Sequence, residues 1–252
     1  MNKVPLSLFT KDGGSLTKII GLNSSRNGID KDASQCRMST GSVETVTIPF
    51  DRFGSYLREL NSSQAIAHGI CGYSAARVVS EKNFLDQPGT VTRTKKYFRY
   101  STGPGLGVFD HDPKPGQVAL TPEEFRKIVV GVCPDFQDVA TVYTPSTSSC
   151  IFDAEGKEIT GVTSGFHLYF VAENAQVLPV FAETLFKRLC LIGHGYPFIT
   201  RSGSTLLRTI FDASVFSPER LDFVSGAVCK RGCSQRLPDP VYTGGGMLKW
   251  TP

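Results

Sequence analysis

The chain has 252 residues, of which 40% are hydrophobic and 20% are charged, proportions typical of a folded globular protein and not of a disordered one. Its net charge of +4 permits a nucleic-acid partner without requiring one. No run reaches the roughly 18 apolar residues of a membrane span, and the amino terminus lacks the apolar core of a signal peptide. Seven unevenly spaced cysteines favour a reducing compartment. We therefore expect a cytoplasmic protein without a membrane segment.

Residues 1–98 are expected to form an N-terminal α/β subdomain. Short β-type runs at 18–20 and 43–48 predict strands, and apolar residues at helical spacing from Phe50 to Leu60 predict a helix. Ser62 or Ser63 as a cap and Gly69 as a stop predict a second, short helix that carries His68.

Residues 91–100 combine basic and aromatic side chains. The basic members are Arg93, Lys95, Lys96 and Arg99, and the aromatic members are Tyr97, Phe98 and Tyr100. Basic groups neutralise phosphates and aromatic rings stack on bases, so this run is a candidate contact for single-stranded DNA. The alternative is a solvated strand face whose aromatic rings lie in the core.

An apolar run at residues 107–109 ends in two carboxylates, Asp110 and Asp112. In a strand these side chains point to the same face, with Cα atoms about 6.5 Å apart, and form a candidate binding site for a hard cation. His111 points to the opposite face, where it is expected to pack, and Pro113 ends the strand. The alternative is a simple turn, because Asp, Pro and Gly are common turn residues.

The next elements are expected to alternate between helix and strand. Thr121 as N-cap with Glu124 three residues later predicts a helix that stops at Gly131. A strand at 139–143 leads into the hydroxyl-rich run 144–149, whose side chains, Ser148 among them, contact a phosphate or merely cap backbone groups. Residues 151–159 predict a hairpin.

The last third of the chain supplies a second set of polar candidates. Alternation at 166–171 places His167 opposite the apolar face of its own strand, although a lone strand histidine is commonly a core residue. A helix is expected at 179–192, followed by a strand at 205–212 that ends on Asp212 with Arg208 on the same face. Ser217 predicts a final helix, and residues 238–252, rich in Pro and Gly, resemble a linker.

Three of these segments, taken in order, resemble the motifs of the archaeo-eukaryotic primase superfamily. The matching stretches are Phe109-Asp110-His111-Asp112, Gly165-Phe166-His167-Leu168-Tyr169-Phe170 and Ile210-Phe211-Asp212. The resemblance covers roughly residues 99–223 and is nearest to the primase-polymerase domains of phage, plasmid and prophage replication proteins, which often precede a helicase. It implies an α/β fold with a mixed sheet, in which an RRM-like catalytic core at 99–237 packs on the N-terminal subdomain and a tail follows at 238–252.

The resemblance also implies roles for individual residues. Asp110, Asp112 and Asp212 are similar to the family's ligands for two divalent metal ions, Mg²⁺ or Mn²⁺, and His167 to its contact with the phosphates of the incoming nucleotide. The family often has Ser-x-His where this chain has Gly165-x-His167, so a hydroxyl contact must come from Ser164 or from the loop that contains Ser148. Arg208 as a phosphate or template contact is an inference from strand parity alone.

The hypothesis is therefore a DNA-templated nucleotidyl transferase that makes or extends a primer from nucleoside triphosphates on single-stranded DNA. The alternatives are a metal-dependent nuclease and a non-catalytic strand- or origin-binding module of a replication protein. Cys190, His194, Cys229 and Cys233 offer a four-ligand zinc set, but free cysteine is commonly a small core residue and zinc is not expected.

Overall fold

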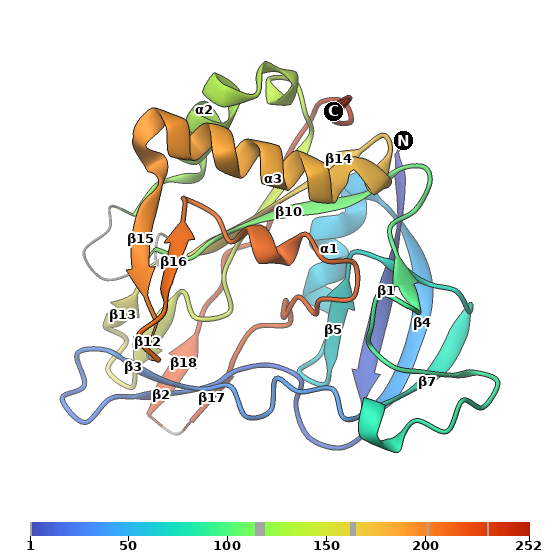
Figure 1. Ribbon diagram of the computed structural model, residues 1–252. Helices are drawn as coiled ribbons and strands as arrows, with labels where there is room; N and C mark the ends of the chain where they lie inside the picture. The colour runs from blue at the N-terminus through green and yellow to red at the C-terminus, as the bar shows by residue number, and fades with distance from the viewer. Residues whose placement is uncertain (1, 114–118, 162–164, 201, 231) are drawn as a thin grey trace.

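The computed structural model describes residues 2–113, 119–161, 165–200, 202–230 and 232–252, and its fold is mixed α/β (Figure 1). Three α-helices occur in this part of the chain: α1 (Phe53–Glu59), α2 (Pro122–Val132) and α3 (Leu178–Leu189). The strands of the first half are β1 (Lys3–Lys11), β2 (Ile19–Leu22), β3 (Ile29–Asp32), β4 (Thr40–Pro49), β5 (Gln64–Ala67), β6 (Ile70–Cys71), β7 (Ala75–Val79), β8 (Thr90–Val91) and β9 (Phe98–Arg99). The later strands are β10 (Gly105–His111), β11 (Thr141–Pro145), β12 (Ile151–Asp153), β13 (Glu158–Thr160), β14 (Phe166–Ala172), β15 (Tyr196–Ile199), β16 (Thr205–Arg208), β17 (Val228–Cys229), β18 (Cys233–Gln235) and β19 (Val241–Thr243).

Two larger sheets organise the molecule. The N-terminal sheet has the order β5-β1-β4-β7-β8, with β7 and β8 parallel and the other neighbours antiparallel. The second sheet has the order β10-β14-β11-β19 and is antiparallel throughout. The expected α/β fold with mixed sheets is confirmed at this level, whereas the division of the chain at residue 98 stays a prediction.

The sheet that contains β10 and β14 is covered on both faces, which explains why its strands are almost continuously apolar. On one face, Phe109 and Phe170 pack with α2 and α3 in a core rich in aromatic rings. On the other face, Val108 and Tyr169 pack against β1 and α1. Alternation along the strands therefore assigns Asp110 and His167, two residues from Val108 and Tyr169, to the side that faces the N-terminal unit.

Three predicted segments differ from the structure. Residues 64–67 form β5 and not a helix, because they pair with the open edge of β1 and bury Ile66 completely. No helix follows Ser217, because Asp222 exchanges backbone hydrogen bonds with Ile66 and so continues that edge. The segment 238–252 is not a free linker, since β19 pairs with β11 and Trp250 packs on Phe181 in the core.

The start of α2 is fixed by its sequence. The Thr121 hydroxyl accepts a hydrogen bond from the Glu124 amide, and the Glu124 carboxylate accepts one from the Thr121 amide. We expect Thr121→Ala to lower the free energy of unfolding by about 1 kcal/mol in urea denaturation, because the Glu124 amide loses its hydrogen-bond acceptor. Ser80→Ala is the control, because Ser80 precedes a short 3₁₀ turn without capping it, and should change stability by less than about 0.5 kcal/mol. Equal effects would contradict the capping argument.

Candidate functional site

The first part of the site is a cross-strand pair. Asp110 of β10 lies directly opposite His167 of β14 in the antiparallel register, and Nε2 of His167 lies 3.6 Å from Oδ1 of Asp110. Both side chains are partly shielded from solvent, with exposed fractions of 28% for Asp110 and 13% for His167. The pairing follows from register and parity, which bring an acid and an imidazole to one face of the sheet.

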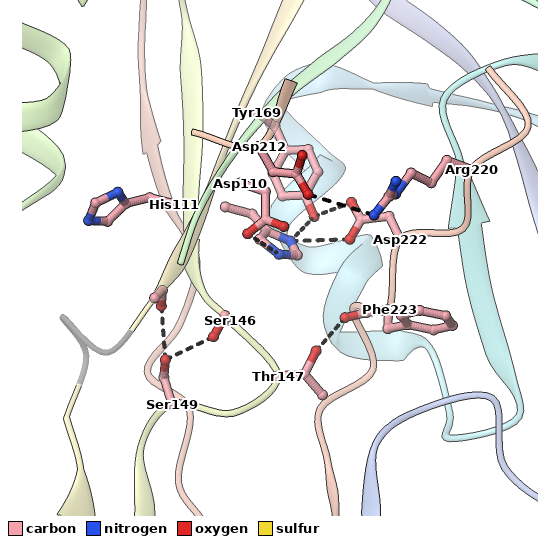
Figure 2. Close-up of polar contacts among 12 residues, drawn as sticks. Asp110, His111, Ser146, Thr147, Ser149, Tyr169, Asp212, Arg220, Asp222 and Phe223 are labelled. Carbon is pink, nitrogen blue, oxygen red and sulfur yellow. Dashed lines mark hydrogen bonds and ion pairs between the residues drawn. The ribbon is translucent and has the colours of Figure 1, made fainter. Parts of the chain in front are cut away.

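The segment that carries Asp212 joins the site from a different part of the chain. β16 ends at Arg208, earlier than expected, and the following residues run beside the end of β10. The Asp212 amide donates to the Asp110 carbonyl (3.0 Å), and Nδ1 of His111 lies 2.7 Å from the Ile210 carbonyl oxygen. Figure 2 shows His111 on the other side of the strand from Asp110, where its ring packs on Phe166. His111 thus anchors the segment and does not join the carboxylates.

The Asp212 carboxylate is held by surrounding donors. Its Oδ1 accepts hydrogen bonds from the Ser214 amide (3.0 Å) and hydroxyl (2.7 Å) and lies 3.2 Å from the Arg208 guanidinium. Its Oδ2 lies 3.7 Å from the guanidinium of Arg220 (Figure 2). The expected proximity of Arg208 and Asp212 is therefore present, although the segment is not a regular strand.

Two cavities meet at Asp110 and Asp112. The larger one, about 460 Å³, also contains Asp212 and Arg208 and is lined on its far side by His194 and Tyr196. All three predicted metal ligands thus line one cavity. Because Asp110 and Asp112 also line the second cavity, they form the boundary between the two spaces.

The second cavity, about 220 Å³, is rich in phosphate-binding groups. Its positive or protonatable side chains are Lys18, His68, His167 and Arg220, and its hydroxyl residues are Ser146, Thr147 and Ser148. Hydrogen bonds to other segments of the chain hold the hydroxyl loop in place: Thr147 donates to the Phe223 carbonyl (2.6 Å) and Ser149 to the Gly165 carbonyl (2.8 Å) (Figure 2). A Cβ on Gly165 would lie 3.0 Å from the Ser146 hydroxyl, so the loop occupies the space that a larger residue would need. Ser164, the other hydroxyl candidate, lies outside the described residues.

A buried ionic network supports His167 from behind. Nδ1 of His167 lies 3.2 Å from Oδ1 of Asp222, while Tyr169 donates its hydroxyl hydrogen to Oδ2 of Asp222 (2.7 Å) and Nε2 of His68 lies 3.2 Å from the same oxygen. Burial alone would lower the pKa of His167, but Asp222 and Asp110 outweigh it and raise the pKa to about 9. Despite burial, His167 and His68 hold the pKa of Asp222 far below its usual range. The imidazole is therefore a fixed cation near neutral pH.

The surroundings of Asp110, unlike those of Asp222, destabilise the charged form of the carboxylate. Burial raises the pKa of Asp110 above its usual value, the His167 charge opposes that rise, and repulsion from Asp222, Asp112 and Asp212 adds to it. A group of neighbouring carboxylates of this kind is stabilised by a bound cation. Among the described residues, however, no three His, Cys, Asp or Glu side chains are already placed to hold a metal ion together.

The predicted DNA-contacting residues are exposed but lie in two different places. Arg93 and Lys95 border a hollow that also contains Arg220, next to the Asp212 segment, whereas Lys96 and Arg99 border another hollow beside β6. Phe98 is completely buried and Tyr100 is 8% exposed, so neither ring can stack on a base. The alternative, aromatic rings in the core, is correct for both.

The zinc candidates do not come together. Cys190 and His194 lie at the end of α3, whereas Cys229 and Cys233 lie on β17 and β18, well apart from that end of the helix (Figure 1). All seven cysteines are free thiols.

Sequence reasoning missed Asp222, Lys18 and Arg220 as members of the site. Each lies in a segment without a local chemical motif, and Lys18 reaches the cavity through the parallel pairing of β2 with β17, over 200 positions along the chain. Tyr169 had a usable signal, because alternation places it on the same face as His167.

No family model, curated protein or solved structure matches this chain. In the described part of the chain, no helix is both long and apolar enough to cross a membrane. The function is therefore argued from the site itself.

Proposed function

We propose that this protein is a metal-dependent, DNA-templated nucleotidyl transferase, a primase or primase-polymerase. The observation that carries the proposal is the placement of Asp110 and Asp112 between a cavity that contains Asp212 and a cavity lined by basic and hydroxyl side chains. Nucleotidyl transfer needs carboxylates between the attacking hydroxyl and a bound triphosphate, and the two cavities provide a place for each.

The second cavity fits the triphosphate of an incoming nucleotide. Lys18, Arg220 and the cationic His167 supply positive charge, and Ser148 in the hydroxyl loop supplies a neutral donor, whereas the Thr147 hydroxyl already donates to the Phe223 carbonyl. Charged donors to phosphate oxygens are strong in a partly desolvated site. In the reaction, His167 would stabilise charge that develops on the leaving pyrophosphate without itself moving a proton.

The residues present fit a divalent metal by the chemistry of their donors. Asp110, Asp112 and Asp212 offer oxygen ligands, which Mg²⁺ and Mn²⁺ prefer. Burial, with a smaller contribution from the neighbouring carboxylates, raises the pKa of Asp110, and a bound cation would stabilise its charged form. The metal would supply Lewis-acid activation of the attacking hydroxyl and stabilisation of the leaving group. Arg208 and Arg220 form ion pairs with Asp212, and these pairs would have to break for that carboxylate to bind the metal.

The order of elements supports the finer fold proposal of an RRM-like core. Apart from β12 and β13, which are inserted between β11 and β14, the elements β10, α2, β11, β14 and α3 have the chain order β-α-β-β-α. Both helices pack on the same face of the sheet, and β14 lies between β10 and β11. The 209–212 segment lies on the free side of β10, in the place of a fourth strand.

The proposal is tested by incubating the protein with single-stranded DNA, nucleoside triphosphates and Mn²⁺ and resolving products on a denaturing gel. We expect new strands and release of pyrophosphate, each dependent on nucleotide and template. Shortening of a labelled DNA strand without nucleotides would instead identify the nuclease alternative. DNA binding without either reaction would identify a non-catalytic module.

Removal of the Lys18 charge gives a more specific test. Lys18→Met should raise the KM for nucleoside triphosphate about tenfold or more with a smaller change in kcat, because a charged contact to phosphate is worth about 1.5–3 kcal/mol. Lys127→Met, on the exposed face of α2, is the control and should leave both constants unchanged. An unaltered KM in Lys18→Met would show that the triphosphate does not occupy the second cavity.

The proposed setting is the cytoplasm, in agreement with seven free thiols, and a helicase that acts on the same template is the proposed partner.

A further inference from the structure

The hairpin of β15 and β16 is a two-stranded sheet that pairs with no other described strand (Figure 1). Its register places Tyr196 opposite Arg208 and Phe198 opposite Leu206. Because side chains alternate between faces along a strand, these four residues share one face of the hairpin, which we call the inner face. The Arg208 guanidinium lies 5.9 Å from the centre of the Phe198 ring on this face, as the register requires.

The inner face is continuous with the larger cavity. Tyr196 and Arg208 line that cavity together with Asp110, Asp112 and Asp212, and Phe198 and Leu206 continue the same face one pair further from the carboxylates. Leu206 is 41% exposed and the two rings are partly exposed. The described chain therefore does not cover this strip of two aromatic rings, an aliphatic side chain and a guanidinium.

The chemistry of the two cavities differs on either side of Asp110 and Asp112. Both cavities have basic groups, but the smaller one has Lys18 and Arg220 with three hydroxyl residues of one loop, whereas the larger one has Arg208 beside apolar groups such as Ile210 and Leu120. A triphosphate in the smaller cavity leaves the larger one for the second reactant, which must present a hydroxyl to the same carboxylates. For strand synthesis, that reactant is the 3′-terminal nucleotide of the growing strand.

We propose that the inner face of the β15–β16 hairpin binds the 3′ end of the primer strand, with its terminal nucleotide in the larger cavity and the preceding bases stacked on Tyr196 and Phe198. This assignment rests on the proposed function of the site. Aromatic rings hold single strands with little sequence preference because every base has a π face, and a guanidinium beside them contacts the backbone phosphate. A primer site must have this sequence tolerance, since the strand it holds changes with every template.

The first test measures binding alone. A 5′-fluorescein-labelled oligothymidylate is titrated with the protein, without nucleotide or metal, and its anisotropy is followed. Phe198→Ala should weaken binding about 5- to 150-fold, the factor that corresponds to loss of one stacked base. Ile199→Ala is the matched control, because Ile199 is the next residue of the same strand, lies on the opposite face and is 70% exposed. Circular dichroism of both variants checks that the hairpin change leaves the fold intact.

The second test determines whether the inner face of the hairpin contacts the primer 3′ end or the template strand. A primer-template duplex carries 5-iodouracil at the primer 3′ end or, in a separate preparation, in the template overhang, and is crosslinked to the protein by light. Peptides that contain Tyr196–Ile199 or Thr205–Arg208 should carry the crosslink from the primer 3′ end. Crosslinks to these peptides from the template overhang alone would overturn the primer assignment.

The two proposals can fail separately. Equal binding by Phe198→Ala and Ile199→Ala in a protein that extends primers would reject the hairpin site and leave the transferase intact. Selective loss of binding in Phe198→Ala, in a protein that makes no product, would reject the transferase and retain the hairpin as a strand contact.

Discussion

Replacing Asp110 by asparagine should reduce primer synthesis by about three orders of magnitude or more. Asparagine keeps the size of the side chain but removes the charge that lies between the two cavities and opposite His167. Stabilisation of the transferred phosphate by a carboxylate-bound metal is worth several kcal/mol, and each 1.36 kcal/mol changes the rate about tenfold. The measurement is the initial rate of labelled-nucleotide incorporation on single-stranded DNA with Mn²⁺.

The control for this variant is Glu183→Gln, which removes an exposed carboxylate from α3 and breaks its pair with Lys187. It should retain full activity. If Asp110→Asn keeps more than about a tenth of the rate, the carboxylate is not a metal ligand and the proposed chemistry is wrong. Thermal unfolding of Asp110→Asn should show no loss of stability, because the raised pKa of Asp110 marks a charge that the fold accommodates poorly.

The site depends on three routes by which distant residues reach one place. Antiparallel register sets Asp110 against His167, hydrogen bonds from Asp212 and His111 attach the 209–212 segment to β10, and the pairing of Asp222 with Ile66 brings a third acidic segment beneath His167. Apart from the His111 side chain, these are backbone interactions, so the positions of the acidic groups are set before any ligand binds. This pre-organisation is what a site that works by charge and position requires.

The parts of this arrangement that follow from local patterns could be predicted from the sequence. Strand parity places Asp110 and His111 on opposite faces of β10, and the cap at Thr121 locates the start of α2. Both inferences depend only on residues within one element. They did not need the partner of that element to be known.

The parts that depend on distant partners could not be predicted. The segment 64–67 becomes a strand because β1 offers an unpaired edge, and Asp222 enters the site because its backbone extends the same edge. Neither residue run differs in composition from an ordinary helix start or loop. Trp250 is predicted to lie in a tail, because no neighbouring residue in the sequence indicates that its ring packs on Phe181 of α3. Tertiary pairing overrides local propensity in each case.

The buried Asp222 network gives the second large expected effect. Asp222→Asn should lower the free energy of unfolding by about 3–5 kcal/mol at pH 6, because two buried histidines and Tyr169 lose the charge that they surround. The control is Asp12→Asn, which breaks an exposed pair with Arg77 and should cost less than about 1 kcal/mol. Unfolding is followed in urea with a chelator present, so that no metal contributes. A loss as small as that of the control would show that the network is not electrostatically coupled.

The pH dependence of this effect distinguishes lost charge from lost packing. The pKa of His167 is raised to about 9 in the folded protein, so its contribution is complete below the unfolded value of about 6.5 and disappears as the pH rises through about 9. The lowered pKa of Asp222 acts in the opposite direction, since its contribution is present above an unfolded value of about 3.9 and disappears only in acid. Between pH 6.5 and 9 the native protein should therefore lose about 3 kcal/mol of stability through His167, and Asp222→Asn should lose less, because only Asp110 remains to raise the pKa of this histidine against burial. A difference between the two proteins that stays constant over this interval would assign the loss to packing and contradict a protonated His167.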